Sequence, residues 1–112
     1  MPALPKLDAP SGGSGGGGLG GTYEAKTSSF TADYQYVYGV DSSGGSVVCT
    51  LPTAAGNAGK MIVVSLRTAG NSLTFNTTSS QTIDGQASGS ISTGVRYNSY
   101  VFISDGSNWM ML

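Results

Sequence analysis

Short stretches of alternating apolar and polar residues fill the chain from residue 34 to its end. Alternation with a period of two indicates a β-strand with one buried face, and the Gly, Pro, Asn, Asp and Ser residues between the stretches favour turns. The most apolar stretch, residues 60–67, predicts the most central strand. The expected strands are residues 34–40, 47–51, 60–67, 72–75, 82–83, 89–92, 97–104 and 108–112.

The turns between these strands define the expected fold. Asp105 and Gly106 are residues that tolerate the positive φ of a tight hairpin turn. Residues 53–59 carry the one helical signal of the chain, with Thr53 as a cap and a glycine at the end, so we expect a single helical turn there. About seven or eight short strands joined in this way predict an all-β fold, a small antiparallel sandwich or barrel.

The first 21 residues have a different composition. They hold three of the four prolines and much of the glycine, which favours an extended, flexible backbone. We therefore divide the chain into an extended Gly/Pro-rich N-terminal arm, residues 1–21, and a β module, residues 22–112. Isolated apolar and proline residues of the arm are candidates for anchoring it to a larger partner, on which the arm would become ordered. These candidates are Leu4, Pro5, Leu7, Pro10 and Leu19.

Charge is sparse along the chain. Five Lys or Arg residues and six Asp or Glu residues leave a formal net charge of −1, and the basic residues are scattered singly. Nucleic-acid binding needs a basic patch, so nucleic acid is not an expected partner. No apolar run reaches the roughly 18 residues of a membrane span, and the N-terminus lacks the apolar core of a signal peptide. We therefore expect no membrane contact, and synthesis in the cytoplasm.

The residue types that catalysis and metal binding use are mostly missing. The chain has no histidine, which excludes a Ser-His-Asp triad, a Cys-His pair and nearly every zinc site. Its single cysteine, Cys49, alternates with Val47 and Leu51 and is interpreted as a small buried side chain. Asp84 and Asp105 each precede a glycine, where a turn explains them. We expect no enzyme activity, no catalytic residue, no metal and no cofactor.

Aromatic residues recur within the expected strands. Tyrosine and tryptophan are enriched in cores and at subunit interfaces. We expect such a role for Tyr34, Tyr36, Tyr38, Tyr100 and Trp109. The alternative is an aromatic platform that binds a host-surface glycan, in which Tyr97 would join these residues.

Three short motifs occur in a fixed order along the β module. The first is Leu-Pro-Thr-Ala-Ala-Gly-Asn-Ala-Gly-Lys at residues 51–60, the second is Thr-Ile-Asp-Gly at residues 82–85, and the third is Ile-Ser-Asp-Gly-Ser-Asn-Trp at residues 103–109. This ordered set resembles the β modules of bacteriophage virion proteins, such as capsid decoration proteins, head fibres, and tail fibres or spikes. The resemblance spans residues 34–112 and leaves the arm uncovered. It implies a homotrimeric β structure on the particle.

The small size of the chain, which begins at its own Met1 and holds only an arm and one module, favours a protein present in many copies on a capsid. We expect a structural virion protein, assembled in the host cytoplasm: a capsid decoration (cement) protein or a head-fibre base subunit. Its arm would bind the major capsid protein or another virion protein and stabilise the shell. Two alternatives stay open, a receptor- or glycan-binding tail fibre or spike module and a polysaccharide-degrading spike fragment.

Overall fold

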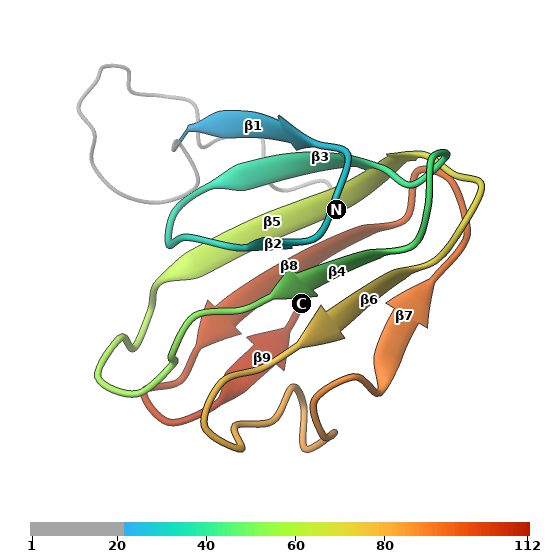
Figure 1. Cartoon of the computed structure of the whole chain (residues 1–112). Coiled ribbons are helices and arrows are strands. Elements are labelled where there is room, and N and C mark those ends of the chain that lie inside the picture. Colours follow the sequence, from blue (N-terminus) through green and yellow to red (C-terminus); the bar gives the residue numbers. More distant parts are fainter. Residues whose placement is uncertain (1–21) are drawn as a thin grey trace.

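Nine strands in two sheets that pack face to face make up the part of the chain that the structure, a computed structural model, describes: residues 22–112 (Figure 1). The five-stranded sheet has the order β1-β3-β5-β8-β9, and the four-stranded sheet has the order β2-β4-β6-β7. The strands are β1 (Tyr23–Lys26), β2 (Phe30–Thr31), β3 (Val37–Asp41), β4 (Val47–Thr50), β5 (Met61–Thr68), β6 (Leu73–Asn76), β7 (Ile91–Thr93), β8 (Ser99–Ser104) and β9 (Trp109–Met111). The expected arm and its anchoring candidates lie outside the described residues.

Consecutive strands in the first half of the module lie in opposite sheets. Strands β1, β3 and β5 pair in parallel in one sheet, and β2, β4 and β6 pair in parallel in the other. The chain therefore crosses from sheet to sheet after each strand and stacks three successive coils on one another (Figure 1). The last three strands are antiparallel: β7 pairs with β6, β8 with β5, and β9 with β8.

The prediction of an all-β fold is confirmed, but the prediction of an antiparallel arrangement is wrong for the first six strands. Alternation does not distinguish the two arrangements, because every second side chain is buried in both. Contacts at the corners, where the chain crosses from one sheet to the other, favour the parallel arrangement. At one corner, the buried Ser42 donates a hydrogen bond of 2.7 Å to the carbonyl of Asn71, and Asn71 Nδ2 donates one of 2.8 Å to the carbonyl of Ser42. These bonds fix successive coils at the same level.

Three local predictions also need correction. Residues 53–59 form turns and no helix, because Gly56 and Gly59 have φ values of 75° and 87°, which a right-handed helix cannot hold. The expected strand at residues 34–40 begins only at Val37. At residues 82–83 the structure has only isolated bridges, from Ile83 to Gln86 and to Trp109.

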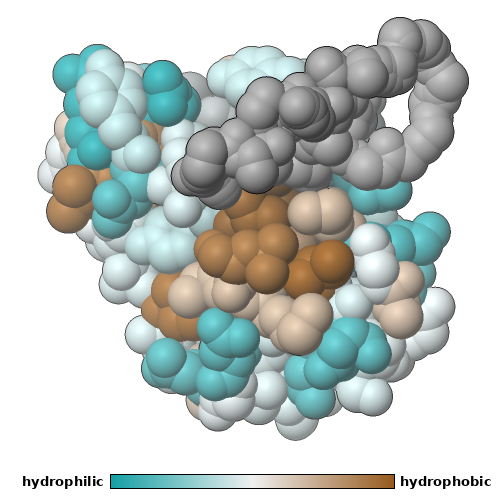
Figure 2. Space-filling view, turned by 180° about the vertical axis from the view of Figure 1, so that it is seen from behind, coloured by the Kyte–Doolittle hydropathy of each residue, from teal (hydrophilic) through white to brown (hydrophobic). Residues whose placement is uncertain are grey.

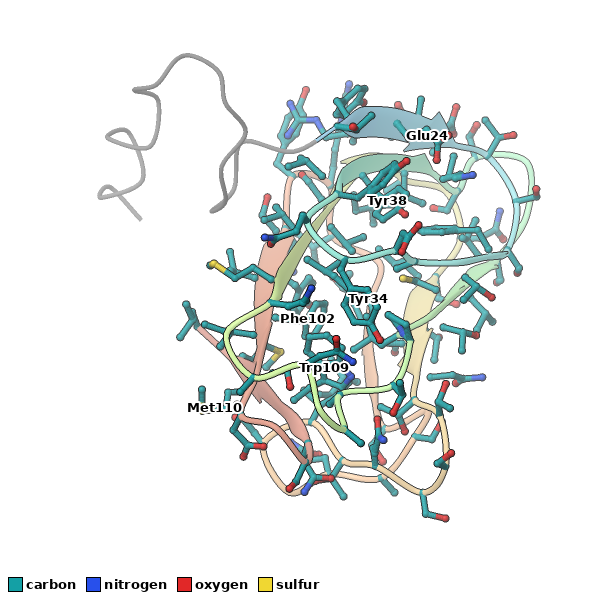
Figure 3. The ribbon with its side chains drawn as sticks, turned by 90° about the vertical axis from the view of Figure 1, so that its left-hand side faces the viewer. Glu24, Tyr34, Tyr38, Phe102, Trp109 and Met110 are labelled. Carbon is teal, nitrogen blue, oxygen red and sulfur yellow. The ribbon has the colours of Figure 1, made fainter. Side chains whose placement is uncertain are left out.

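The core lies between the two sheets. Parallel pairing places Phe30, Cys49 and Phe75 in one row on the inner face of the four-stranded sheet. From the other sheet, Phe102 meets Phe75 edge to face, with ring centroids 4.9 Å apart. Figure 3 shows Tyr38, Phe102 and Trp109 pointing into this space from the five-stranded sheet. Burying a side chain of this size contributes roughly 1.5–3 kcal/mol, so this layer is the main source of stability.

The three motif segments of the sequence meet at one end of the module. Gly59 N donates to the carbonyl of Ser104 at 2.8 Å, which joins the first motif to the third. Asp84 N donates to the carbonyl of Trp109 at 2.9 Å, which joins the second motif to the third. The β8–β9 hairpin turns at the predicted place, over residues 105–108, and Gly106 has the expected positive φ, 98°. Residues far apart in the sequence thus form one hydrogen-bonded unit.

Trp109 closes this unit, and we expect its loss to be severe. Its side chain is 1% exposed, and its Nε1 donates to the carbonyl of Pro52 at 3.1 Å. Trp109→Ala should lower the free energy of unfolding by about 3–5 kcal/mol in urea denaturation, because it leaves a cavity and an unpaired carbonyl. The control Ser107→Ala, at an exposed position of the same hairpin, should change it by less than about 0.5 kcal/mol. Equal losses would show that the tryptophan does not hold the hairpin to the core.

Candidate functional site

The structure places the five predicted aromatic residues in or against the core. Tyr38 and Trp109 belong to the buried core, and Tyr34, Tyr36 and Tyr100 pack against it. Tyr34 is further held because its hydroxyl accepts a hydrogen bond of 3.1 Å from Asn57 Nδ2. A surface platform that uses all of these rings therefore does not form, because Tyr38 and Trp109 are buried.

Cys49 is buried among apolar side chains. Its exposed fraction is zero, and burial raises the pKa of its thiol to about 12. A thiol with such a pKa is inert as a nucleophile at neutral pH. This environment agrees with the interpretation of Cys49 as a small core side chain.

The acidic residues that precede glycines serve the local fold. The Asp105 carboxylate accepts hydrogen bonds of 2.8 Å from the backbone N–H groups of Asn108 and Ser107, which lower its pKa. Asp84 has a φ of 49°, and its carboxylate accepts a bond of 3.2 Å from Met111 N. Within residues 22–112, no group of three or more His, Cys, Asp or Glu residues could hold a metal ion, and no helix is long and apolar enough to cross a membrane.

The outer face of the five-stranded sheet carries an apolar patch at its centre. On this face Met61 of β5 lies opposite Ile103 of β8, Val63 lies opposite Val101, and Met110 of β9 lies opposite Ile103. Figure 2 shows the patch in brown, and in Figure 3 Met110 points away from the core. We call this patch the apolar face and define it as Met61, Val63, Val101, Ile103, Met110 and Leu112.

Several residues of the apolar face remain accessible to solvent. Met110 is 39% exposed and Leu112 is 72% exposed, Met61, Val63 and Ile103 are half-buried, and Val101 at the centre is buried. The face itself holds no charged side chain. Contiguous exposed apolar patches on a sheet mark sites of protein association. The apolar face is therefore the candidate functional site.

The other sheet shows what a solvated outer face looks like in this molecule. The residues that alternate with the core positions of β4, β6 and β7 are mostly polar. They are Val48, Thr50, Thr74, Asn76 and Ser92. A sheet with one wet face follows this pattern of apolar-in and polar-out. Because the centre of the five-stranded sheet is apolar on both faces, it departs from the pattern of a face left in water.

The sequence analysis missed the apolar face, although the chain carries a signal for it. Met61 to Val64 are apolar at every position, and so are Tyr100 to Ile103, whereas a strand with one wet face would alternate. Continuous apolar runs indicate burial on both sides. The run at residues 60–67 was interpreted as a central strand, but its apolar residues on the face away from the core were not interpreted as an interface.

Comparison with known proteins finds no match, either among protein families or among curated proteins.

The burial of Cys49 and Tyr38 generates a test in alkaline solution. Burial raises the pKa of both groups to about 12, so the unfolded chain loses their protons at a lower pH than the folded chain does. Stability should be constant from neutral pH to about pH 8.5 and should fall as the pH rises toward 12, which urea titrations at several pH values would measure. In Cys49→Ala the decline should be shallower, because only Tyr38 then contributes. An identical decline in this variant would contradict the assigned cause.

Proposed function

We propose that the chain is a non-enzymatic structural subunit of a bacteriophage particle, a capsid decoration protein or head-fibre base that forms a homotrimer. The observation that carries this proposal is the apolar face, an accessible and uncharged surface on a small module whose other outer face is polar. Its occupant is a second copy of the same chain. The N-terminal arm then binds the shell, through the major capsid protein or another virion protein.

The chemistry of the apolar face favours a second copy over a partner of different character. No charge has to be buried when the faces of three copies meet around a common axis, so association carries no desolvation penalty for an unpaired ion. Two charged residues flank the apolar part of β5 and lie outside the face: Lys60, which directly precedes the strand, and Arg67 near its end. A rim of charge around an apolar centre is the usual organisation of a subunit interface.

The assignment to a phage particle is supported by the resemblance of the three motifs. These segments are joined by backbone hydrogen bonds, such as those from Gly59 to Ser104 and from Asp84 to Trp109. A set of motifs that folds as one unit has a physical reason to occur together. The mechanism on the particle is linkage: contacts that exist only in the assembled shell stabilise it by mass action.

Self-association can be tested with one charged substitution in the apolar face. Ile103→Glu should convert the full-length protein from a trimer to a monomer in sedimentation equilibrium, because the interface would bury an unpaired carboxylate. Its circular dichroism should stay unchanged, since the side chain lies outside the core. The control Thr74→Glu adds the same charge to the outer face of the four-stranded sheet and should remain trimeric. A wild-type protein that sediments as a monomer would contradict the proposal.

The role on the shell can be tested by heating. Particles that carry the protein should release their DNA at a higher temperature than particles that lack it, because bridging contacts must break before the shell opens. Adding back the Ile103→Glu variant should restore less of the difference than adding back wild-type protein. Equal release temperatures with and without the protein would rule out a cement function.

A further inference from the structure

The outer face of the five-stranded sheet changes character toward the end of β5 (Figure 2). Beyond Val63, the outward residues of β5 are Ser65 and Arg67. The loop between β7 and β8 adds Arg96 and Tyr97 at the same place, because Tyr97 N donates to the carbonyl of Leu66 in β5. One half of this face is therefore apolar, and the other half is cationic and aromatic.

Two guanidinium groups lie against one ring. The Cζ atoms of Arg67 and Arg96 are each 4.7 Å from the centroid of the Tyr97 ring, so they are no more than twice that distance apart. Arg96 Nε donates to the carbonyl of Arg67 at 2.9 Å, and Arg67 Nη1 donates to Ser65 Oγ at 3.1 Å. The array is fixed by contacts within the module.

Among the described residues, these two cations have no acidic partner. Within residues 22–112 the one ion pair joins Lys26 to Glu24, and neither arginine takes part in it. A guanidinium carries five N–H donors, and most of those on Arg67 and Arg96 have no acceptor among the described residues. Two positive charges held on one ring repel each other, and an anion that contacts both guanidinium groups would offset that repulsion.

The backbone at Tyr97 has an unfavourable conformation, and the Tyr97 ring is exposed to solvent. Tyr97 and Asn98 together oppose the single residue Leu66, to which both are hydrogen bonded, so this is a β-bulge. Tyr97 has a φ of 73°, in the left-handed region that glycine usually occupies in such a bulge. Its side chain is 56% exposed, and it does not belong to the core. Strain that core packing does not offset is typical of functional positions.

A second exposed ring lies beside Arg67. Tyr23 of β1 is 60% exposed, and its hydroxyl end lies over Gly39 of β3. A Cβ atom at Gly39 would collide with this hydroxyl and would be 3.2 Å from Arg67 Cγ. The glycine therefore provides the space in which the phenol and the arginine stem lie together. Tyr23, Arg67, Arg96 and Tyr97 form one continuous array, which we call the Arg–Tyr cluster.

We infer that the Arg–Tyr cluster is a binding site for an acidic saccharide, a sugar that carries a carboxylate or a phosphate. The guanidinium forks match the oxygens of either anion and can bind them with paired hydrogen bonds. The exposed tyrosine rings offer an apolar surface to the sugar ring and a hydroxyl to its oxygens. Ser65 and Ser99, whose hydroxyls are 2.9 Å apart, supply further polar groups between β5 and β8.

The inference rests on the cluster alone and does not depend on binding to a shell. A single exposed site of this size binds weakly, but copies on a trimer or a particle act together and raise the overall affinity. An extended nucleic acid does not fit, since it needs a continuous basic track and the described part of this face offers two arginines.

The binding test is an NMR titration of the full-length protein. The probes are trigalacturonate, which carries carboxylates, glucose 6-phosphate, which carries a phosphate, a neutral galactose trisaccharide and inorganic phosphate. Amide signals of residues 66–68 and 96–98 should shift with an acidic sugar, and the tighter of the two acidic sugars identifies the anion. The neutral trisaccharide and inorganic phosphate should each bind about tenfold more weakly or worse. Inorganic phosphate binding as tightly as the sugars, or no binding of any acidic sugar, would overturn the inference.

Charge variants show whether the cluster itself makes the contact. Arg67→Gln and Arg96→Gln should each weaken binding of the acidic sugar by about tenfold or more, because each removes charged hydrogen bonds. Lys60→Gln is the matched control: Lys60 also lies over a tyrosine ring, 5.7 Å from the centroid of Tyr34, at the other end of β5. It removes the same charge and should leave binding unchanged. An equal loss of binding in Lys60→Gln would show that the sugar is attracted by the overall positive charge and not by the Arg–Tyr cluster.

Two further variants test the rings without removing charge. Tyr97→Gly places the residue preferred in the bulge, so thermal stability should be retained while binding is lost. Gly39→Ala keeps all four side chains of the cluster but displaces the Tyr23 phenol, and binding should fall several-fold. Tyr23→Ser removes the same phenol at an exposed position and should weaken binding as much as Gly39→Ala does. Unchanged binding in Tyr97→Gly or in Tyr23→Ser would contradict a role for the rings.

Discussion

The structure depends on the burial of aromatic and aliphatic side chains between two sheets that the chain enters in turn. Because consecutive strands of the coils belong to opposite sheets, each coil adds one side chain to a row on the inner face, as Phe30, Cys49 and Phe75 show for the four-stranded sheet. The antiparallel strands that follow complete both sheets and add Phe102 and Trp109. Without the contact between the sheets, neither sheet would have a buried side. The outer faces therefore depend on the packing of this inner layer of side chains.

The two outer faces then divide the roles of the module. The four-stranded sheet presents threonine, asparagine and serine to solvent, whereas the five-stranded sheet presents the apolar face and, beside it, the Arg–Tyr cluster. One surface is suited to contact with protein, and its neighbour is suited to an anionic ligand. A subunit that associates with its own copies through the first would hold the second in a repeated array. The proposed structural role and the inferred ligand site are therefore compatible on one sheet.

The sequence predicted the class of the fold but not its topology. Alternating stretches located β3 to β9 approximately, and the Asp105–Gly106 turn was predicted correctly. Parallel pairing could not be predicted, because alternation is the same in both arrangements and the crossing between sheets depends on corner contacts such as that of Ser42 with Asn71. The Arg–Tyr cluster was out of reach for a similar reason: Tyr23, Gly39, Arg67 and Tyr97 meet only through the sheet register. The apolar face, in contrast, was present in the sequence as runs without alternation.

The central claim is that this chain is a repeated structural subunit of a particle, held to its own copies through the apolar face. The most direct measurement is a cryo-electron-microscopy map of the phage particle that carries it. We expect trimers in many copies on the capsid, with Ile103 and Met110 covered by neighbouring copies. A map in which the protein occurs as single copies with the apolar face in contact with solvent, or only at the tail, would contradict the account.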